Sequence, residues 1–172
     1  MFYQQFSRNG EHLANLFEHP ELIVNKVASA IKKHFPECDC IAGNAGISSA
    51  AVVMPIALKM KKPFVFARTK KSHSHARCVG HTGVFTKGGR SKRFSNIVVI
   101  DDFMETGTSL TDTVGHISEY LYVVPAGIVL YSGVCPPQSV SRKNRLKTEE
   151  GEFVWKSASQ KISHIPIVTF RS

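Results

Sequence analysis

The stretch that decides the fold is IVVIDDFMETGTSLTD, residues 97–112. It begins with four apolar residues, which are typical of a strand buried on both faces of a sheet. Asp101 and Asp102 follow directly, and a short turn then leads through Thr106-Gly107-Thr108-Ser109 into an expected helix over residues 108–121. The stretch therefore predicts a buried strand, two acids at its carboxyl end and a glycine-containing turn into a helix.

Each part of this turn suits one part of a sugar phosphate. The unpaired N–H groups at a helix N-terminus bind phosphate, and the helix dipole favours its negative charge. Gly107 allows close approach of the backbone, and the neighbouring hydroxyls add donors. The two carboxylates would repel a phosphate, so we expect them to bind sugar hydroxyls or a hydrated Mg²⁺. The simpler alternative is a strand that ends in surface acids before a helix capped by Thr or Ser.

The rest of the chain supplies strands and helices in alternation. We expect helices at residues 20–35 and 48–61, the second kinked or shortened by Pro55, and strands at 38–46, 62–69, 126–134 and 165–170. Residues 70–96 and 134–164 read as irregular, apart from a ribbon around residues 81–85. This order predicts an α/β fold with a parallel twisted sheet and helices on both faces. In such sheets ligands bind beyond the carboxyl ends of the strands.

Length and composition limit the class of protein. The chain has 172 residues, of which 42% are hydrophobic, and this suits a single domain over residues 1–172. No apolar run approaches the roughly 20 residues of a membrane helix. The start, MFYQQFSRNGEH, lacks the layout of a secretory signal, and the four cysteines have no zinc-type spacing. We therefore expect a cytoplasmic protein with free thiols and no membrane partner.

The net charge of +9 comes from one segment. Residues 40–100 contain no Asp or Glu but eleven Lys or Arg, whereas the rest of the chain has eleven basic and thirteen acidic residues. Clustered positive charge attracts phosphate groups or nucleic acid, and a solvated basic surface is the plain alternative. Nucleic acid fits less well, because the acids at the strand end would repel a phosphate backbone.

Residues 97–109 resemble the phosphoribosyl diphosphate (PRPP) signature of the type I phosphoribosyltransferases: four apolar residues, two acids, a variable pair or triplet, then Thr-Gly-x-Thr/Ser. Element order extends the resemblance over a core of residues 38–133, with residues 1–37 and 134–172 as a small hood. The resemblance implies a Mg²⁺-dependent enzyme that transfers the 5-phosphoribosyl group from PRPP to a nucleobase-like nitrogen acceptor and releases diphosphate. It also implies a homodimer.

The same resemblance implies roles for individual residues. Asp101 and Asp102 would hold the ribose hydroxyls and, partly through water, Mg²⁺. The 5-phosphate would be bound by Glu105, Thr106, Gly107, Thr108 and Ser109. The diphosphate would be bound by Gly43, Asn44, Ala45, Gly46, Arg68, Lys70 and Lys71. The catalytic residues would be Glu105, Lys71 and His73, with Arg77 as a further cation, and residues 70–95 would close over the diphosphate as a loop.

Several alternatives stay open at this point. Glu105 stands where hypoxanthine-guanine enzymes carry an Asp that is proposed to exchange a proton with the purine. Its carboxylate therefore either serves this role or points to solvent, in which case only its backbone N–H contributes to the 5-phosphate loop. Ala45 stands where the orotate enzymes carry a Lys, so the acceptor base is open. Phe153 and Trp155 either stack on that base or belong to the core. A regulator that binds PRPP or a nucleotide without catalysis is the main alternative function, and a nucleic-acid-binding protein is the other.

Overall fold

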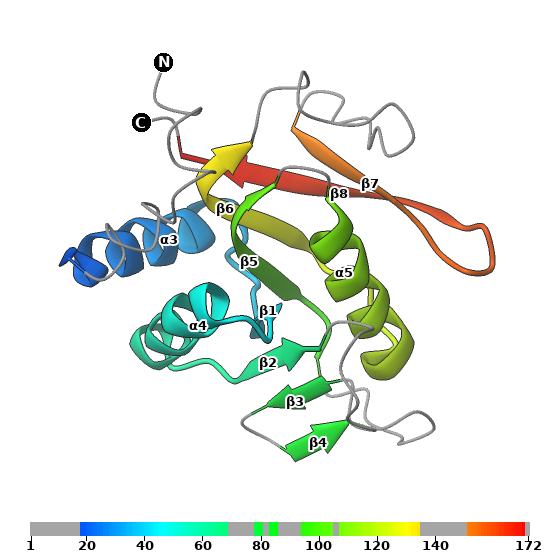
Figure 1. The fold of residues 1–172 in the computed structure, drawn as a ribbon, viewed down its shortest axis with the longest axis horizontal. Helices are drawn as coiled ribbons and strands as arrows, with labels where there is room; N and C mark the ends of the chain where they lie inside the picture. The colour runs from blue at the N-terminus through cyan, green and yellow to red at the C-terminus, as the bar shows by residue number, and fades with distance from the viewer. Residues whose placement is uncertain are drawn as a thin grey trace.

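The computed structural model describes residues 18–68, 78–80, 83–85, 94–104, 107–134 and 151–170. Within these residues the chain forms an eight-stranded sheet in the order β4-β3-β2-β1-β5-β6-β8-β7 (Figure 1). The middle of the sheet, from β2 through β1, β5 and β6 to β8, is parallel, and the outer strands are antiparallel. The strands are β1 Cys40–Asn44, β2 Phe64–Ala67, β3 Cys78–Gly80, β4 Gly83–Phe85, β5 Ile97–Met104, β6 Gly127–Val134, β7 Glu152–Lys156 and β8 Ile162–Thr169. The expected α/β class with a mostly parallel sheet is confirmed.

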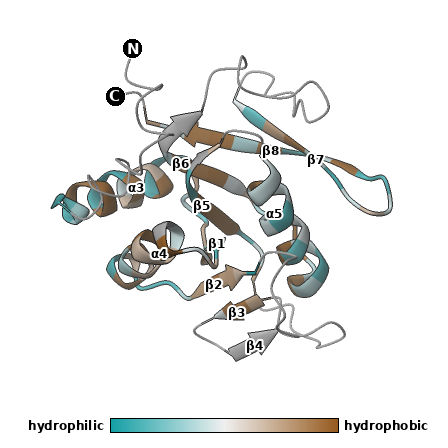
Figure 2. Cartoon of the chain, in the orientation of Figure 1, coloured by the Kyte–Doolittle hydropathy of each residue, from teal (hydrophilic) through white to brown (hydrophobic). Residues whose placement is uncertain are grey.

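Helices cover both faces of the sheet. Helices α3 (Pro20–His34) and α4 (Ile47–Met60) lie on one face, and α5 (Thr108–Leu121) lies on the other (Figure 1). Neighbouring residues of a strand point to opposite faces, so Ile41 packs in the core beside α3 and α4 while Ala42 packs in the core beside α5. Both faces of the central strands are therefore buried, which explains their unbroken apolar runs (Figure 2). No helix in the described ranges is long and apolar enough to cross a membrane.

Helix α3 forms part of the layer that covers the sheet. It begins at Pro20, whose fixed φ suits the first helical turn, and it ends after a run of basic residues that favour the negative end of the dipole. Val27 and Ile31 are fully buried in the core that α3 shares with α4 and β6. Residues 1–17 and 135–150, which make up much of the expected hood, lie outside the described residues.

Of the expected kink or shortening of the second helix at Pro55, the shortening is wrong. Helix α4 continues for 14 residues through Pro55 and ends at Met60, followed by Lys61 in the left-handed conformation. Proline leaves the carbonyl four residues earlier without its N–H donor. The carbonyl concerned is that of Ala51. Because Pro55 is exposed, this carbonyl lies on the outer side of the helix, where water can donate a hydrogen bond to it.

Two stretches that read as irregular contain strands. Strand β3 pairs with both β2 and β4, and β4 coincides with the expected ribbon around residues 81–85. Strand β7 pairs with β8, which begins at Ile162, three residues before the expected start. Alternation within β7 directs Phe153 and Trp155 into the core beside α5, where both are buried. These two side chains therefore belong to the core and not to a base-stacking surface.

Candidate functional site

Three predicted segments meet at one edge of the sheet. Strand β1 lies between β2 and β5, with Asn44 beside Ala67 and Gly43 beside Ile100. Because the three strands are parallel, the segments that follow them share the edge of the sheet formed by their carboxyl ends (Figure 1). The structure thus brings the loop after β1 close to Arg68, after β2, and to the acids of β5.

The acid pair lies inside β5 and not beyond its end. Strand β5 continues to Met104 because it stays paired with β6 through this region. The Asp101 side chain is buried, with 8% of its surface exposed, and Asp102 is half-buried. The Asp102 N–H donates to Asp101 Oδ1 at 3.1 Å. The pairing with β6 shifts register between Asp101 and Phe103, and such a shift interrupts the regular ladder beside the two acids.

The electrostatics of the pair favour the arrival of a cation. Burial raises the pKa of the Asp101 carboxyl, and the charge of Asp102 raises it further. A bound divalent cation would reverse this effect by favouring the ionised forms. The described residues contain no group of three or more His, Cys, Asp or Glu able to hold a metal. Two adjacent carboxylates nevertheless fit hydrated Mg²⁺, which commonly binds one or two carboxylates together with substrate phosphates and water.

The start of α5 offers backbone donors to an anion. Gly107 is the N-cap residue of the helix and has a φ of 72°, a left-handed conformation that glycine adopts without strain. Among the described residues no side chain caps this helix start, and no acid lies in its first turn. The side chains of Thr108 and Ser109 are exposed beside the helix N-terminus. Glu105 and Thr106, the other residues predicted to bind the 5-phosphate, lie outside the described residues.

The loop after β1 is held tightly against its neighbours. A Cβ built on Gly43 would lie 2.6 Å from Ser49 Oγ, 2.7 Å from Val53 Cγ2 and 3.1 Å from the Ile100 carbonyl oxygen, so this position requires glycine. The Ser49 hydroxyl donates to that same carbonyl at 3.3 Å, which ties α4 to β5. The Ala45 N–H donates to the Ala67 carbonyl at 2.9 Å. The Ala45 N–H is therefore already used within the fold.

Part of the basic segment can be placed. Arg68 directly follows β2 and is half-buried, next to the end of β1. The predicted cations Lys70, Lys71, His73 and Arg77 lie outside the described residues. At the other end of this segment, the Asp39 carboxylate accepts hydrogen bonds from the N–H groups of Ser95, at 2.7 Å, and Asn96, at 3.0 Å. These two bonds fix the chain where it enters β5.

Two polar residues near the site were not predicted. Ser49 is 1% exposed and points at the sheet from α4, and Tyr131 is 9% exposed and lies in β6 next to the acid-bearing strand. A signal was present for Tyr131, because a tyrosine interrupts the apolar run of its strand. Ser49 gave no such signal, since small hydroxyl residues are common near a helix start.

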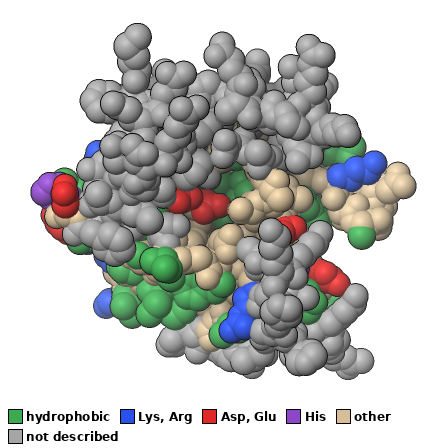
Figure 3. All heavy atoms as spheres, in the orientation of Figure 1, with side chains coloured by type: hydrophobic (Ala, Val, Ile, Leu, Met, Phe, Trp, Pro, Cys, Tyr) green, Lys and Arg blue, Asp and Glu red, His purple; other side chains and the backbone are tan. Residues whose placement is uncertain are grey.

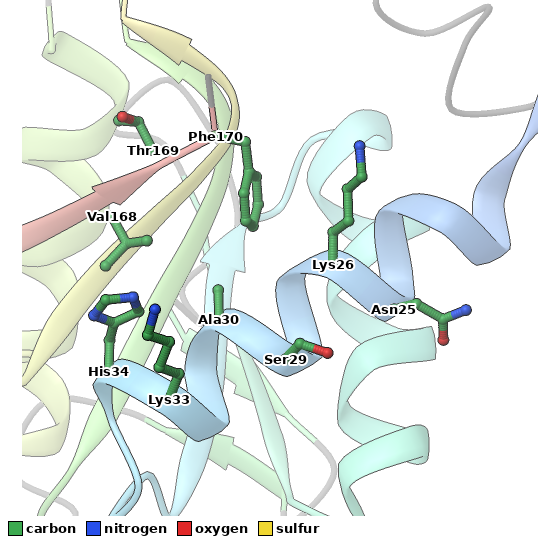
Figure 4. A pocket seen from close by; sticks show the side chains of 9 residues that line it. All are labelled: Asn25, Lys26, Ser29, Ala30, Lys33, His34, Val168, Thr169 and Phe170. Atoms are coloured by element: carbon green, nitrogen blue, oxygen red, sulfur yellow. The ribbon is translucent and has the colours of Figure 1, made fainter. Parts of the chain in front are cut away.

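A separate groove lies between α3 and the end of β8. Its volume is about 480 Å³, and the close-up shows the side chains that line it (Figure 4). None of the predicted site residues is among them. The lining residues are Asn25, Lys26, Ser29, Ala30, Lys33, His34, Val168, Thr169 and Phe170. The groove is therefore distinct from the edge where the predicted site residues meet.

The arrangement defines a class of protein. An acid pair in a central parallel strand, followed by a glycine turn and an uncapped helix N-terminus, is typical of an α/β domain that binds a sugar phosphate. The family model of the phosphoribosyl transferase domain matches residues 16–156. The chain belongs to this family, and the resemblance drawn from residues 97–109 is confirmed.

Curated relatives and solved structures agree with this assignment. The chain is 37% identical over 95 residues to orotate phosphoribosyltransferase of Streptococcus pyogenes serotype M12, covering 54% of this chain and 40% of the relative. It is 34% identical over 105 residues to the Cytophaga hutchinsonii orotate phosphoribosyltransferase, covering 59% of this chain and 45% of the relative. The chain thus spans less than half the length of these relatives.

Among solved structures, the fold resembles adenine phosphoribosyltransferases. The Trypanosoma brucei enzyme superimposes with a TM-score of 0.61 at 18% identity, covering 92% of this chain and 67% of that one. The Saccharomyces cerevisiae enzyme gives a TM-score of 0.58 at 18% identity, covering 90% and 81%. At this identity the likeness shows the shared fold.

Proposed function

We propose that this chain is a Mg²⁺-dependent phosphoribosyltransferase that transfers the 5-phosphoribosyl group between PRPP and a nucleobase-like nitrogen acceptor. The observation that carries the proposal is the acid pair within β5 together with Gly107 at the N-terminus of the next helix, α5. Relatives named as orotate phosphoribosyltransferases support it, as does the Trypanosoma brucei structure, which holds AMP, pyrophosphate and ribose-5-phosphate.

The reaction divides into separate tasks at this edge of the sheet. The bond from the anomeric carbon to a diphosphate oxygen breaks and its electron pair leaves with the diphosphate, while the acceptor nitrogen forms a new bond and loses a proton. Asp101 and Asp102 hold the ribose hydroxyls and hydrated Mg²⁺. The α5 N-terminus, with Thr108 and Ser109, binds the 5-phosphate. Mg²⁺, when bound, supplies positive charge to the diphosphate oxygens.

The remaining roles fall to the loop after β1 and to the basic segment. The loop Gly43–Gly46 and Arg68 bind the diphosphate from the neighbouring strand ends. Lys70, Lys71 and His73 stabilise the charge that develops on the leaving group, and Glu105 exchanges the acceptor proton.

The free thiols of Cys38, Cys40 and Cys78 are consistent with a reducing cytoplasm.

A homodimer forms part of the proposal, and α4 offers a surface for it. Ile47, Met54 and Leu58 share one face of the helix, and they are 78%, 42% and 71% exposed. Hydrophobic side chains gather over α4 in the space-filling view (Figure 3). Exposed apolar patches of this kind are common at interfaces between proteins.

Diphosphate release measured across adenine, orotate, hypoxanthine and nicotinate, each with PRPP and Mg²⁺, tests the proposed activity. We expect release with one acceptor class, loss of release without Mg²⁺, and loss in the double variant Asp101→Asn/Asp102→Asn. Glu37→Gln, which changes an exposed acid outside the site, is the matched control. Tight PRPP binding without release for any acceptor would identify the chain as a PRPP-binding regulator instead.

A further inference from the structure

Tyr131 has a buried hydroxyl that forms no hydrogen bond within the described residues. Its side chain is 9% exposed, and within the described part of the chain its hydroxyl oxygen is buried without a hydrogen-bond partner. Buried phenols normally find a partner, because leaving such a group unpaired is unfavourable. Phenylalanine would fill the same space without this cost, so the hydroxyl calls for an explanation.

The position of Tyr131 relates it to the acid pair. Strands β5 and β6 are neighbours (Figure 1). Asp101 pairs with Leu130 and the register shifts between Asp101 and Phe103, so Tyr131, which follows Leu130, lies at this shift beside Asp102. Ile100 and Tyr131 both pack in the core beside α3 and α4. Alternate residues of a strand share a face, and Asp102 is two residues after Ile100. Asp102 and Tyr131 are therefore lateral neighbours on one face.

The local charges support this placement. Burial raises the pKa of the Tyr131 hydroxyl, and the charges of Asp102 and Asp101 raise it further. These two carboxylates are the charged groups that act on the phenol within the described residues. The hydroxyl consequently keeps its proton throughout the neutral range and is available only as a neutral donor or acceptor next to two acids.

We infer that Tyr131 is a positioning residue for the ligand site: its hydroxyl donates a hydrogen bond to the Asp102 carboxylate when the acid pair binds its ligand. The inference rests on the proposed function, because the ligand is the Mg²⁺–PRPP complex. A hydrogen bond to one carboxylate oxygen of Asp102 fixes the direction of the other oxygen. The Tyr131 hydroxyl, which has no hydrogen-bond partner within the described residues, would thus gain one when the ligand binds.

Tyr131→Phe tests the inference, because it removes the hydroxyl and keeps the ring. We expect the dissociation constant of Mg²⁺–PRPP, measured by calorimetry, to rise about tenfold, as for a lost hydrogen bond to a charged group. The melting temperature of the free protein should be unchanged or higher. The loss should appear in the affinity for Mg²⁺–PRPP and not in the stability of the free protein. Tyr122→Phe, at an exposed tyrosine beyond α5, is the control.

The outcomes separate the two proposals. If the wild type binds Mg²⁺–PRPP and Tyr131→Phe binds it equally well, the inference is overturned and the proposed function stands. A lower melting temperature with unchanged affinity would show a purely structural hydroxyl and would also overturn it. If the wild type itself binds no Mg²⁺–PRPP, the proposed function fails, and the role of Tyr131 in that site fails with it.

Discussion

Replacing Gly43 by alanine tests how the loop after β1 is held. The new methyl group would lie 2.6 Å from Ser49 Oγ and 2.7 Å from Val53 Cγ2, and the Ile100 carbonyl oxygen at 3.1 Å closes the third side. Either α4 moves away from the sheet, or Ser49 rotates and gives up its hydrogen bond to Ile100. Overpacking of this kind lowers the free energy of unfolding by about 1–3 kcal/mol. Alanine also reduces the conformational freedom of the unfolded chain, which raises the free energy of unfolding by only about 0.4–1 kcal/mol.

We therefore expect Gly43→Ala to lower the free energy of unfolding by about 1–2 kcal/mol, measured by urea denaturation. It should also weaken Mg²⁺–PRPP binding, because a shift of α4 displaces the Gly43–Gly46 loop. Gly115→Ala is the matched control, since a Cβ at that helical position meets nothing within 4 Å. This control should stabilise the protein by about 0.5–1 kcal/mol. Equal stabilities for the wild type and Gly43→Ala would refute the packing described for this loop.

Two further predictions concern the acid pair and the oligomer. Folding raises the pKa of the Asp101 carboxyl, so ionisation of this carboxyl lowers the free energy of unfolding. The loss is absent below the usual carboxyl pKa of about 4 and grows as the pH rises toward the raised pKa of Asp101. Asp101→Asn should therefore unfold at a higher temperature than the wild type at pH 8 and at a similar one at pH 4, and an advantage confined to acid pH would contradict this. In light scattering, the wild type should have the mass of two 19.0 kDa chains, and Leu58→Glu should have the mass of one. Ile162→Glu, at an exposed residue of β8, is the control and should stay dimeric. A dimeric Leu58→Glu variant would rule out the α4 surface as the interface.

Much of the fold could be predicted from local pattern. Apolar residues at helical spacing placed α3 and α5 closely, and continuous apolar runs placed β5 and β6. The acid pair and Gly107 were found because an acid pair, a glycine and hydroxyl residues follow one buried strand in a fixed order. These features are set by neighbours in the sequence, so the sequence reveals them.

Other features depend on partners distant in the chain. Strand β7 follows a polar stretch of sequence, and its alternation of apolar and polar residues is short. This alternation indicates a strand only once the pairing with β8 is known. Strand β5 extends past the acids because β6 continues to pair with it, which no local pattern shows. Tyr131 can be proposed as a positioning residue only because the pairing of β5 with β6 places it at the register shift beside Asp102. The tight fit around Gly43 likewise involves α4 and β5 together.

The most direct test of the central claim is calorimetric titration of Mg²⁺–PRPP into the wild type and into Asp101→Asn/Asp102→Asn. The claim is that the acid pair and the α5 N-terminus form one sugar-phosphate site. It predicts saturable binding to the wild type and at least about a hundredfold loss in the double variant, since each contact to a charged group is worth about 1.5–3 kcal/mol. Equal affinity of the two proteins, with the double variant still folded, would contradict it.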